Sequence, residues 1–289
     1  MKITQLNSYE QIVTFINDAD YHSASYLYKL PQAHEDVEAT IKQAIEDPGV
    51  FAQLDDQNDI VMLLLAFKYE DNKYKVIGPF VKKSVSLSKD DFKSLFAALA
   101  QSKPDTANFN FSFEENEQAY APYMKAIEAS YSFTDYHLIS TQDVGKVDHA
   151  QNITEYRPAY YRSFKKLHDY TFKHDVMTTD EITESLDEYN KLFVFMSEGL
   201  LKGYLYIQIF PATKRAEIKY FSSHADYRFM GIAFDLLSYA LQFTFSNYNI
   251  ERVYFKIRSK NNTLVERFHE LGFNINYEYK KFKYVAAHL

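Results

Sequence analysis

The chain has 289 residues, a formal net charge of −7 and no cysteine, so a disulfide framework and a thiolate metal site are both excluded. Hydrophobic residues make up 46% of the chain and charged residues 25%, the composition of a globular protein with enough apolar material for two cores. The acidic balance argues against nucleic acid as a partner. It would suit a cationic amine, although a solvated acidic surface is the commoner explanation.

The sequence also carries no signal for membrane targeting. Residues Met1–Gln5 contain no apolar signal core, and the longest apolar run, Ile60–Phe67, is far too short to cross a bilayer. We therefore expect a cytoplasmic protein without membrane contacts. A homodimer is left open.

Residues 1–140 alternate between strand and helix patterns. Strands are expected at 2–5, 50–54, 60–69, 74–81, 108–113 and 133–139. Helices are expected at 9–18, 34–46, 88–101 and 118–129. The next stretch, residues 140–152, is polar and nonperiodic, which predicts a linker.

Residues 153–289 repeat the same order of elements. Strands are expected at 153–157, 192–197, 203–210, 215–221, 252–257 and 275–284. Helices are expected at 159–172, 179–189, 231–246 and 262–271. The fold class is therefore α/β with a mixed sheet, and the repeated order predicts two tandem domains, 1–145 and 146–289. A single continuous α/β domain is the alternative.

The stretch from Arg215 to Phe245 is the most informative part of the chain. Alternation places Ala216, Ile218 and Tyr220 on one face of a strand, with Glu217 and Lys219 on the other. A glycine-containing loop then leads into an amphipathic helix. Backbone amides at such a helix start, together with the helix dipole, favour an anion such as a pyrophosphate. The loop has neither the three glycines of a Rossmann fingerprint nor the Gly-Lys-Ser/Thr of a P-loop.

The loop sequence Arg228-Phe-Met-Gly231-Ile-Ala233 fits R/Q-x-x-G-x-G/A, and the chain later reads Val253–Asn261 followed by a helix that ends in Gly272-Phe273. This ordered set resembles the acetyl-CoA site of the GNAT N-acetyltransferase family. The resemblance implies acetyl-CoA as a co-substrate and no metal. It implies that the pantetheine arm pairs with the fourth strand, that loop amides hold the pyrophosphate, and that the thiol end lies beside Asn261 and Phe268. The implied acetyl-CoA-binding residues are Phe221, Ser222, Ser223, Arg228, Phe229, Met230, Gly231, Ile232, Ala233, Asn261 and Phe268.

The resemblance also suggests a catalytic base. Glu217 lies eleven residues before Arg228, the spacing of the catalytic glutamate in the histone-acetyltransferase branch of the family. A carboxylate there could remove the proton of an amine, directly or through water. The alternative is a polar residue on a half-exposed strand, paired with Lys219 or Arg215.

The sequence departs from the family pattern in three places. Phe268 stands where a tyrosine usually protonates the departing thiolate, so that step falls to another group (Tyr220, Tyr277 or Tyr279) or to solvent. Leu264 replaces a smaller residue, and Phe229 replaces the first glycine of the loop.

The first block lacks the phosphate loop. Its corresponding strand is interrupted by Gly78-Pro79, and no R-x-x-G-x-G/A follows, so we expect a GNAT-like domain that does not bind CoA well. The pairs His34 with Asp36 and His168 with Asp169 lack metal-ligand spacing and are expected at the surface.

The hypothesis is an N-acetyltransferase that moves an acetyl group from acetyl-CoA to a primary amine of a small molecule, peptide or protein. One alternative is a non-catalytic CoA-binding or scaffold module, which Phe268 favours. Another is an aminoacyl-tRNA-dependent peptidyltransferase, since those proteins also pair two GNAT-like domains. That activity would need a basic groove that this acidic sequence does not predict.

Overall fold

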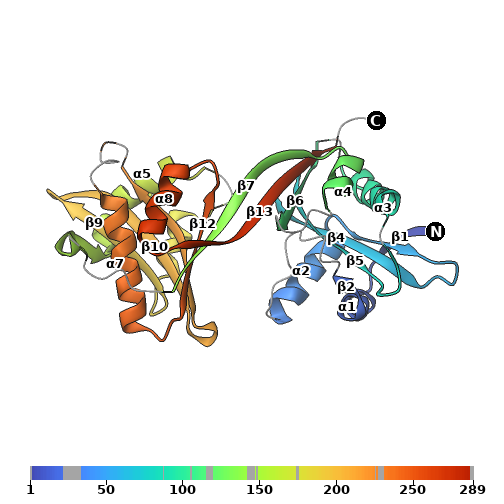
Figure 1. Ribbon diagram of the computed structural model, residues 1–289, viewed down its shortest axis with the longest axis horizontal. Helices are drawn as coiled ribbons and strands as arrows, with labels where there is room; N and C mark the ends of the chain where they lie inside the picture. Colours follow the sequence, from blue (N-terminus) through green and yellow to red (C-terminus); the bar gives the residue numbers. More distant parts are fainter. Residues whose placement is uncertain are drawn as a thin grey trace. The chain divides into compact units, whose positions relative to one another are not determined.

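The computed structural model describes residues 2–21, 34–86, 88–104, 106–114, 120–141, 147, 149–173, 176–224, 226 and 231–286. The chain divides into two compact units, residues 1–135 with 278–289, and residues 136–277 (Figure 1). Each unit is a mixed sheet with helices, which confirms the predicted fold class. The unit boundaries fall within two strands, whereas the predicted division was at residue 145. No helix in the described part of the chain is long and apolar enough to span a membrane.

The first unit contains the elements that the sequence predicts, in the predicted order. Its helices are α1 (Tyr9–Asp18), α2 (His34–Glu46), α3 (Lys89–Gln101) and α4 (Ala121–Ala126). Its strands are β1 (Lys2–Leu6), β2 (Asp20–Tyr21), β3 (Val50–Leu54), β4 (Ile60–Glu70), β5 (Lys73–Val81), β6 (Asn108–Glu114) and the start of β7 (Ser130–Ser140). The sheet order is β1-β3-β4-β5-β6, and β2 pairs with β5.

The last strand of the chain completes the sheet of the first unit. Strand β13 (Asn274–Val285) pairs antiparallel with β6, from Tyr279 opposite Glu114 to Val285 opposite Asn108. The centroid of the Phe282 ring lies 5.7 Å from that of Tyr120, and the two ring planes meet at 64° in an edge-to-face contact. The C-terminal strand therefore supplies both backbone hydrogen bonds and aromatic packing to the first unit.

This arrangement predicts a unit-specific stability effect. Phe282→Ala removes a half-buried ring, so the free energy of unfolding of the first unit should fall by about 2 kcal/mol. Hydrogen exchange should show faster opening of β6 and unchanged protection of the second unit. Lys283→Ala is the neighbouring control. Equal loss of protection in both units would contradict the assignment of β13 to the first unit.

The second unit repeats the element order. Its helices are α5 (Tyr161–Thr171), α6 (Thr179–Glu184), α7 (Ile232–Asn247) and α8 (Asn262–Glu270). Its strands are β8 (Ile153–Glu155), β9 (Asn190–Ser197), β10 (Leu200–Phe210), β11 (Arg215–Ser223) and β12 (Arg252–Arg258), and short 3-10 helices span Ala150–Asn152, Pro158–Tyr160 and Pro211–Thr213. The sheet order is β7-β12-β11-β10-β9-β8.

Two apolar clusters show which helices cover which face of this sheet. Residues of α7 and α8 pack with Ile218 and Phe255 on one face. Residues of α5 and α6 pack with Tyr204 and Tyr206 on the opposite face. We call these the α7 face and the α5 face.

Two predicted elements were wrong in detail. The helix expected at 179–189 ends at Glu184, because the carboxylate of Asp187 accepts hydrogen bonds from the amides of Tyr189 and Asn190 and turns the chain into β9. The expected linker 140–152 is partly ordered into the second unit. Val147 is buried in its core, and the His149 Nδ1 lies 2.8 Å from a carboxylate oxygen of Asp235.

Candidate functional site

Strands β11 and β12 separate partway along their length. Their parallel register runs from Arg215 opposite Arg252 to Ile218 opposite Phe255. Strand β11 continues to Ser223 while still paired with β10 on its other side. In the recorded register, residues 219–223 therefore have no partner on β12. Unpaired backbone N–H and C=O groups of this kind can pair with an extended ligand, as an added strand would.

A β-bulge at Lys219 determines which side chains of β11 lie on the α5 face of the sheet and which lie on the α7 face. Tyr206 lies opposite Tyr220 and Ile207 opposite Ile218, so Lys219 is the extra residue. The predicted alternation was therefore wrong after Ile218. Tyr220 lies on the α5 face with Glu217, not with Ala216 and Ile218, because one added residue reverses the side-chain period of two.

The part of β11 that is not paired with β12, residues 219–223, also forms hydrogen bonds with residues on the α5 face. The Ser222 and Thr171 hydroxyl oxygens lie 2.7 Å apart, and the Thr171 hydroxyl donates to the Leu167 carbonyl. The backbone amide of Met177 donates to the Tyr220 hydroxyl at 3.0 Å. Together with the pairing to β10, these hydrogen bonds position the part of β11 beyond the bulge, which has no recorded partner on β12.

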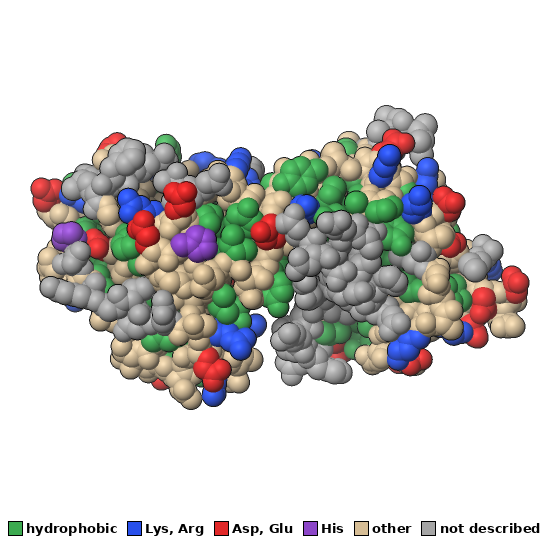
Figure 2. All heavy atoms as spheres, in the orientation of Figure 1, with side chains coloured by type: hydrophobic (Ala, Val, Ile, Leu, Met, Phe, Trp, Pro, Cys, Tyr) green, Lys and Arg blue, Asp and Glu red, His purple; other side chains and the backbone are tan. Residues whose placement is uncertain are grey.

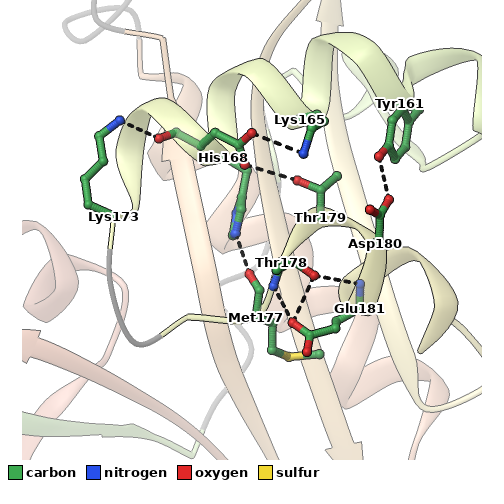
Figure 3. Close-up of polar contacts among 10 residues, drawn as sticks. Tyr161, Lys165, His168, Lys173, Met177, Thr178, Thr179, Asp180 and Glu181 are labelled. Carbon is green, nitrogen blue, oxygen red and sulfur yellow. Dashed lines mark hydrogen bonds and ion pairs between the residues drawn. The ribbon is translucent and has the colours of Figure 1, made fainter. Parts of the chain in front are cut away.

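His168 supports the same segment from within the core. Its Nε2 lies 2.8 Å from the Met177 carbonyl, which accepts, and its Nδ1 lies 2.6 Å from the Tyr204 hydroxyl, which donates. Figure 3 shows the imidazole directed at Met177, next to the capping residues of α6. The side chain is only 1% exposed, so the expectation of a surface histidine was wrong. It sits beside a hollow of about 330 Å³ lined by the end of α5 and residues 176–178.

Burial lowers the pKa of His168 below its ordinary value. As the pH falls below about 6.5, the unfolded chain takes up this proton and the folded chain does not, so stability should fall with falling pH. The urea midpoint of the wild type should therefore drop more steeply between neutral and mildly acidic pH than that of His168→Gln, which cannot titrate there. Parallel midpoints for the two proteins would show that His168 does not control this dependence.

The start of α7 lies at the end of the opening. Gly231 is its N-cap residue, with φ 75° and no side chain to bond the first-turn amides. Ile232 is buried, and a Cβ on Gly203 would lie 2.9 Å from its Cγ2, so the helix start packs closely on β10. Ala233 is half-buried. Arg228, Phe229 and Met230, predicted with this group, lie outside the described residues.

The β12 side of the opening is aromatic. Phe268 is fully buried, stacked on Phe255 with ring centroids 4.8 Å apart, and lies 6.0 Å from the ring of Phe221. Phe221 is half-buried and covers this pair. Asn261 is exposed at the N-cap of α8 and makes no side-chain capping bond. Phe268 therefore presents no accessible surface of its own in this structure.

Glu217 lies on the α5 face, just before the strands separate. It pairs with Gln208 on β10 and with Tyr254 on β12. Its carboxylate is 3.2 Å from the Lys219 ammonium, and its side chain is 25% exposed. A solvent-accessible carboxylate beside the opening can accept a proton from a bound amine.

The structure thus brings Glu217, Phe221, Ser222, Ser223 and Gly231 together along β11 and the start of α7. The sequence did not predict the residues that hold this part of β11 in place, because no local pattern links them to the strand. They are Thr171, His168 and Met177. In the described part of the chain, no group of three His, Cys, Asp or Glu side chains could hold a metal ion.

The sequence profile of the acetyltransferase (GNAT) family matches residues 151–273. This part of the chain is a GNAT domain. No curated protein matches the sequence significantly. The chain resembles the GCN5-related N-acetyltransferase from Sphaerobacter thermophilus, with 12% identity, a TM-score of 0.67, and coverage of 99% of this chain and 96% of that one.

Two further solved structures extend the likeness to both units. A tandem GNAT protein from the clavulanic acid biosynthesis pathway is 12% identical, with a TM-score of 0.66 and coverage of 100% of this chain and 99% of that one. A GNAT acetyltransferase from Colwellia psychrerythraea is 12% identical, with a TM-score of 0.58 and coverage of 98% and 100%. The predicted tandem GNAT fold is therefore confirmed.

Proposed function

We propose that the protein is an N-acetyltransferase whose GNAT domain transfers an acetyl group from acetyl-CoA to a primary amine. The observation that carries the proposal is the separation of β11 and β12 next to a helix start without a side-chain cap, within a domain of an acetyltransferase family. An extended thioester arm fits the unpaired edge of β11, and phosphates fit the amides of α7.

In this proposal, residues 219–223 hold the pantetheine arm. The amides of Ile232 and Ala233 face the pyrophosphate. The family resemblance adds the amides of Phe229, Met230 and Gly231 and the charge of Arg228 to this role, although residues 228–230 lie outside the described part of the chain. Asn261 lies toward the thiol end. Phe268 acts through Phe221, whose ring it supports from below.

The amine must lose a proton before its lone pair attacks the thioester carbonyl. Glu217 accepts that proton, directly or through a water molecule. The attack then forms a tetrahedral oxyanion with a protonated nitrogen, and the amide forms as the thiolate leaves and the nitrogen gives its remaining extra proton to the thiolate or to solvent. Phe268 has no proton to give, so the thiolate leaves as an anion or is protonated by another group (Tyr220, Tyr277 or Tyr279) or by solvent. The amine and Glu217 therefore carry the proton transfer in this site.

The first unit, by contrast, is proposed not to bind CoA. Its helix α3 corresponds to α7, but Ser88 caps it and accepts a hydrogen bond from the Asp91 amide. Asp90 and Asp91 add negative charge to the first turn, which disfavours a phosphate. The cap of α3 thus already uses one first-turn amide and adds negative charge, whereas the Gly231 N-cap of α7 has no side chain that could bond its first-turn amides.

Calorimetric titration with acetyl-CoA tests the proposal. We expect one binding site per chain, with micromolar affinity. Binding without transfer to any amine would instead favour a non-catalytic CoA-binding module. A wild-type protein that does not bind acetyl-CoA would overturn the proposal.

The surface shown in Figure 2 does not support the alternative of an aminoacyl-tRNA-dependent peptidyltransferase. On the face drawn in Figure 2, Lys and Arg side chains of the second unit are interspersed with Asp and Glu. They do not gather there into one basic groove of the kind that nucleic-acid backbones require.

A further inference from the structure

Helix α7 carries a buried carboxylate at the terminus where the proposed phosphates would bind. Asp235 lies in the first turn of α7, and its backbone amide donates to the Gly231 carbonyl. A helical side chain covers the turn on the N-terminal side of its own Cα, so this carboxylate lies over the start of α7. A negative charge there opposes phosphate binding. Without a compensating cation, α7 would have the same disadvantage as α3.

His149 lies where such a cation is needed. Its Nδ1 is 2.8 Å from a carboxylate oxygen of Asp235. The His149 side chain is 54% exposed, whereas the Asp235 side chain is 11% exposed. An ionised carboxylate only accepts hydrogen bonds, so Nδ1 is the donor. The other ring nitrogen, Nε2, has no recorded partner among the described residues, which leaves it available to a ligand.

Few other charges lie on the elements around this pair, as far as the structure describes them. The turn Ala150–Asn152 that follows His149 has no charged residue, and the only other titratable residue of α7 is Tyr239. The charged residues of the adjoining strands β8 and β9 are Glu155 and Lys191, which pair with each other. Asp148 lies outside the described residues. Among the described side chains, His149 is therefore the recorded charge partner of Asp235.

We propose that protonated His149 completes the phosphate site of α7, because it neutralises Asp235 through Nδ1 and donates a hydrogen bond from Nε2 to a phosphate oxygen of acetyl-CoA. This inference rests on the proposed acetyl-CoA binding. Histidine side chains ordinarily change charge between about pH 5 and 8. Since phosphate binding favours the protonated ring, the affinity for acetyl-CoA should decrease as the pH rises through this range.

Titration calorimetry with acetyl-CoA at about pH 6 and about pH 8.5 tests this contact. At the lower pH, His149→Gln should weaken binding about ten-fold, because it leaves the Asp235 charge uncompensated and removes a charge-assisted hydrogen bond. At the higher pH, the two proteins should bind within about two-fold of each other, because the wild-type ring is then neutral as well. The ratio of the two Kd values at each pH cancels the ionisation of the ligand itself.

Three controls separate phosphate binding from a structural role. His149→Lys keeps a positive charge at both pH values, so at the higher pH it should bind acetyl-CoA more tightly than His149→Gln does. S-acetylpantetheine, which lacks the phosphates, should bind equally to the wild type and to His149→Gln. His269→Gln replaces an exposed histidine in the last turn of α8, where Nδ1 contacts the Phe273 carbonyl, and should bind acetyl-CoA like the wild type.

The outcomes separate this inference from the function beneath it. Equal affinity of the wild type and His149→Gln at the lower pH would overturn the role of His149 and leave acetyl-CoA binding standing. A loss that is the same at both pH values and extends to S-acetylpantetheine would also overturn it, because the ring would then only support the fold. A wild type that binds no acetyl-CoA at either pH would overturn both proposals.

Discussion

Gly231→Asp is expected to weaken acetyl-CoA binding by about 100-fold or more. The new carboxylate would sit at the N-cap of α7, where it could accept hydrogen bonds from the first-turn amides and occupy the anion position. It would also place a negative charge a few ångströms from the pyrophosphate, which costs several kcal/mol at an interfacial dielectric. Titration calorimetry of the variant measures the loss directly.

Gly199→Asp is a closely matched control. Gly199 has φ 73° and Gly231 has φ 75°, and a Cβ at either position would meet no atom within 4 Å. Both substitutions therefore carry a similar backbone penalty and add the same charge. Gly199 lies in the β9–β10 turn, so its variant should bind acetyl-CoA like the wild type. Equal loss of affinity in both variants would point to a general destabilisation.

Glu217→Gln is expected to lower kcat by about 100-fold or more, within the range of general-base catalysis. The substitution keeps the size of the side chain and its half-buried position, so acetyl-CoA affinity should not change. The remaining activity should increase with pH across the neutral range, because only the unprotonated amine can attack when no base assists it. Steady-state rates at several pH values measure both effects.

Glu270→Gln serves as the control, because Glu270 is exposed on α8 and pairs only with Arg267 in the recorded ion pairs. If the Glu217→Gln variant kept the wild-type kcat, Glu217 would not be the general base. The role of Glu217 would then be structural, through its ion pair with Lys219.

Local signals predicted the order of elements well. Ser88 does cap α3, the glycine of the loop does begin α7, and the repeated order does correspond to two GNAT-like units. Each of these features depends on neighbours within a few residues, which periodicity and capping chemistry report.

Long-range features were not predictable. The bulge at Lys219 appears only when β11 pairs with β10, and it decides that Tyr220 faces His168. Within the core, His168 forms a hydrogen bond with Tyr204, which is 36 residues away in the sequence. The return of β13 to the first unit likewise depends on β6 and cannot be inferred from alternation alone.

The capping difference between the two units is the clearest physical contrast between them. Ser88 and its neighbouring carboxylates occupy the start of α3, whereas Gly231 leaves the start of α7 without a side-chain cap. We propose that these few residues at one helix terminus decide which of the two units binds the pyrophosphate of CoA.

Acetyl transfer at the second unit is tested most directly by a single assay. Purified protein is mixed with acetyl-CoA and, in separate reactions, with each of a panel of primary amines. Free thiol is followed with time, and the mass of the product is determined by mass spectrometry. We expect thiol release that requires the amine, a product heavier by one acetyl group, and no release by Gly231→Asp. Thiol release that is independent of the amine, or that persists unchanged in Gly231→Asp, would contradict it.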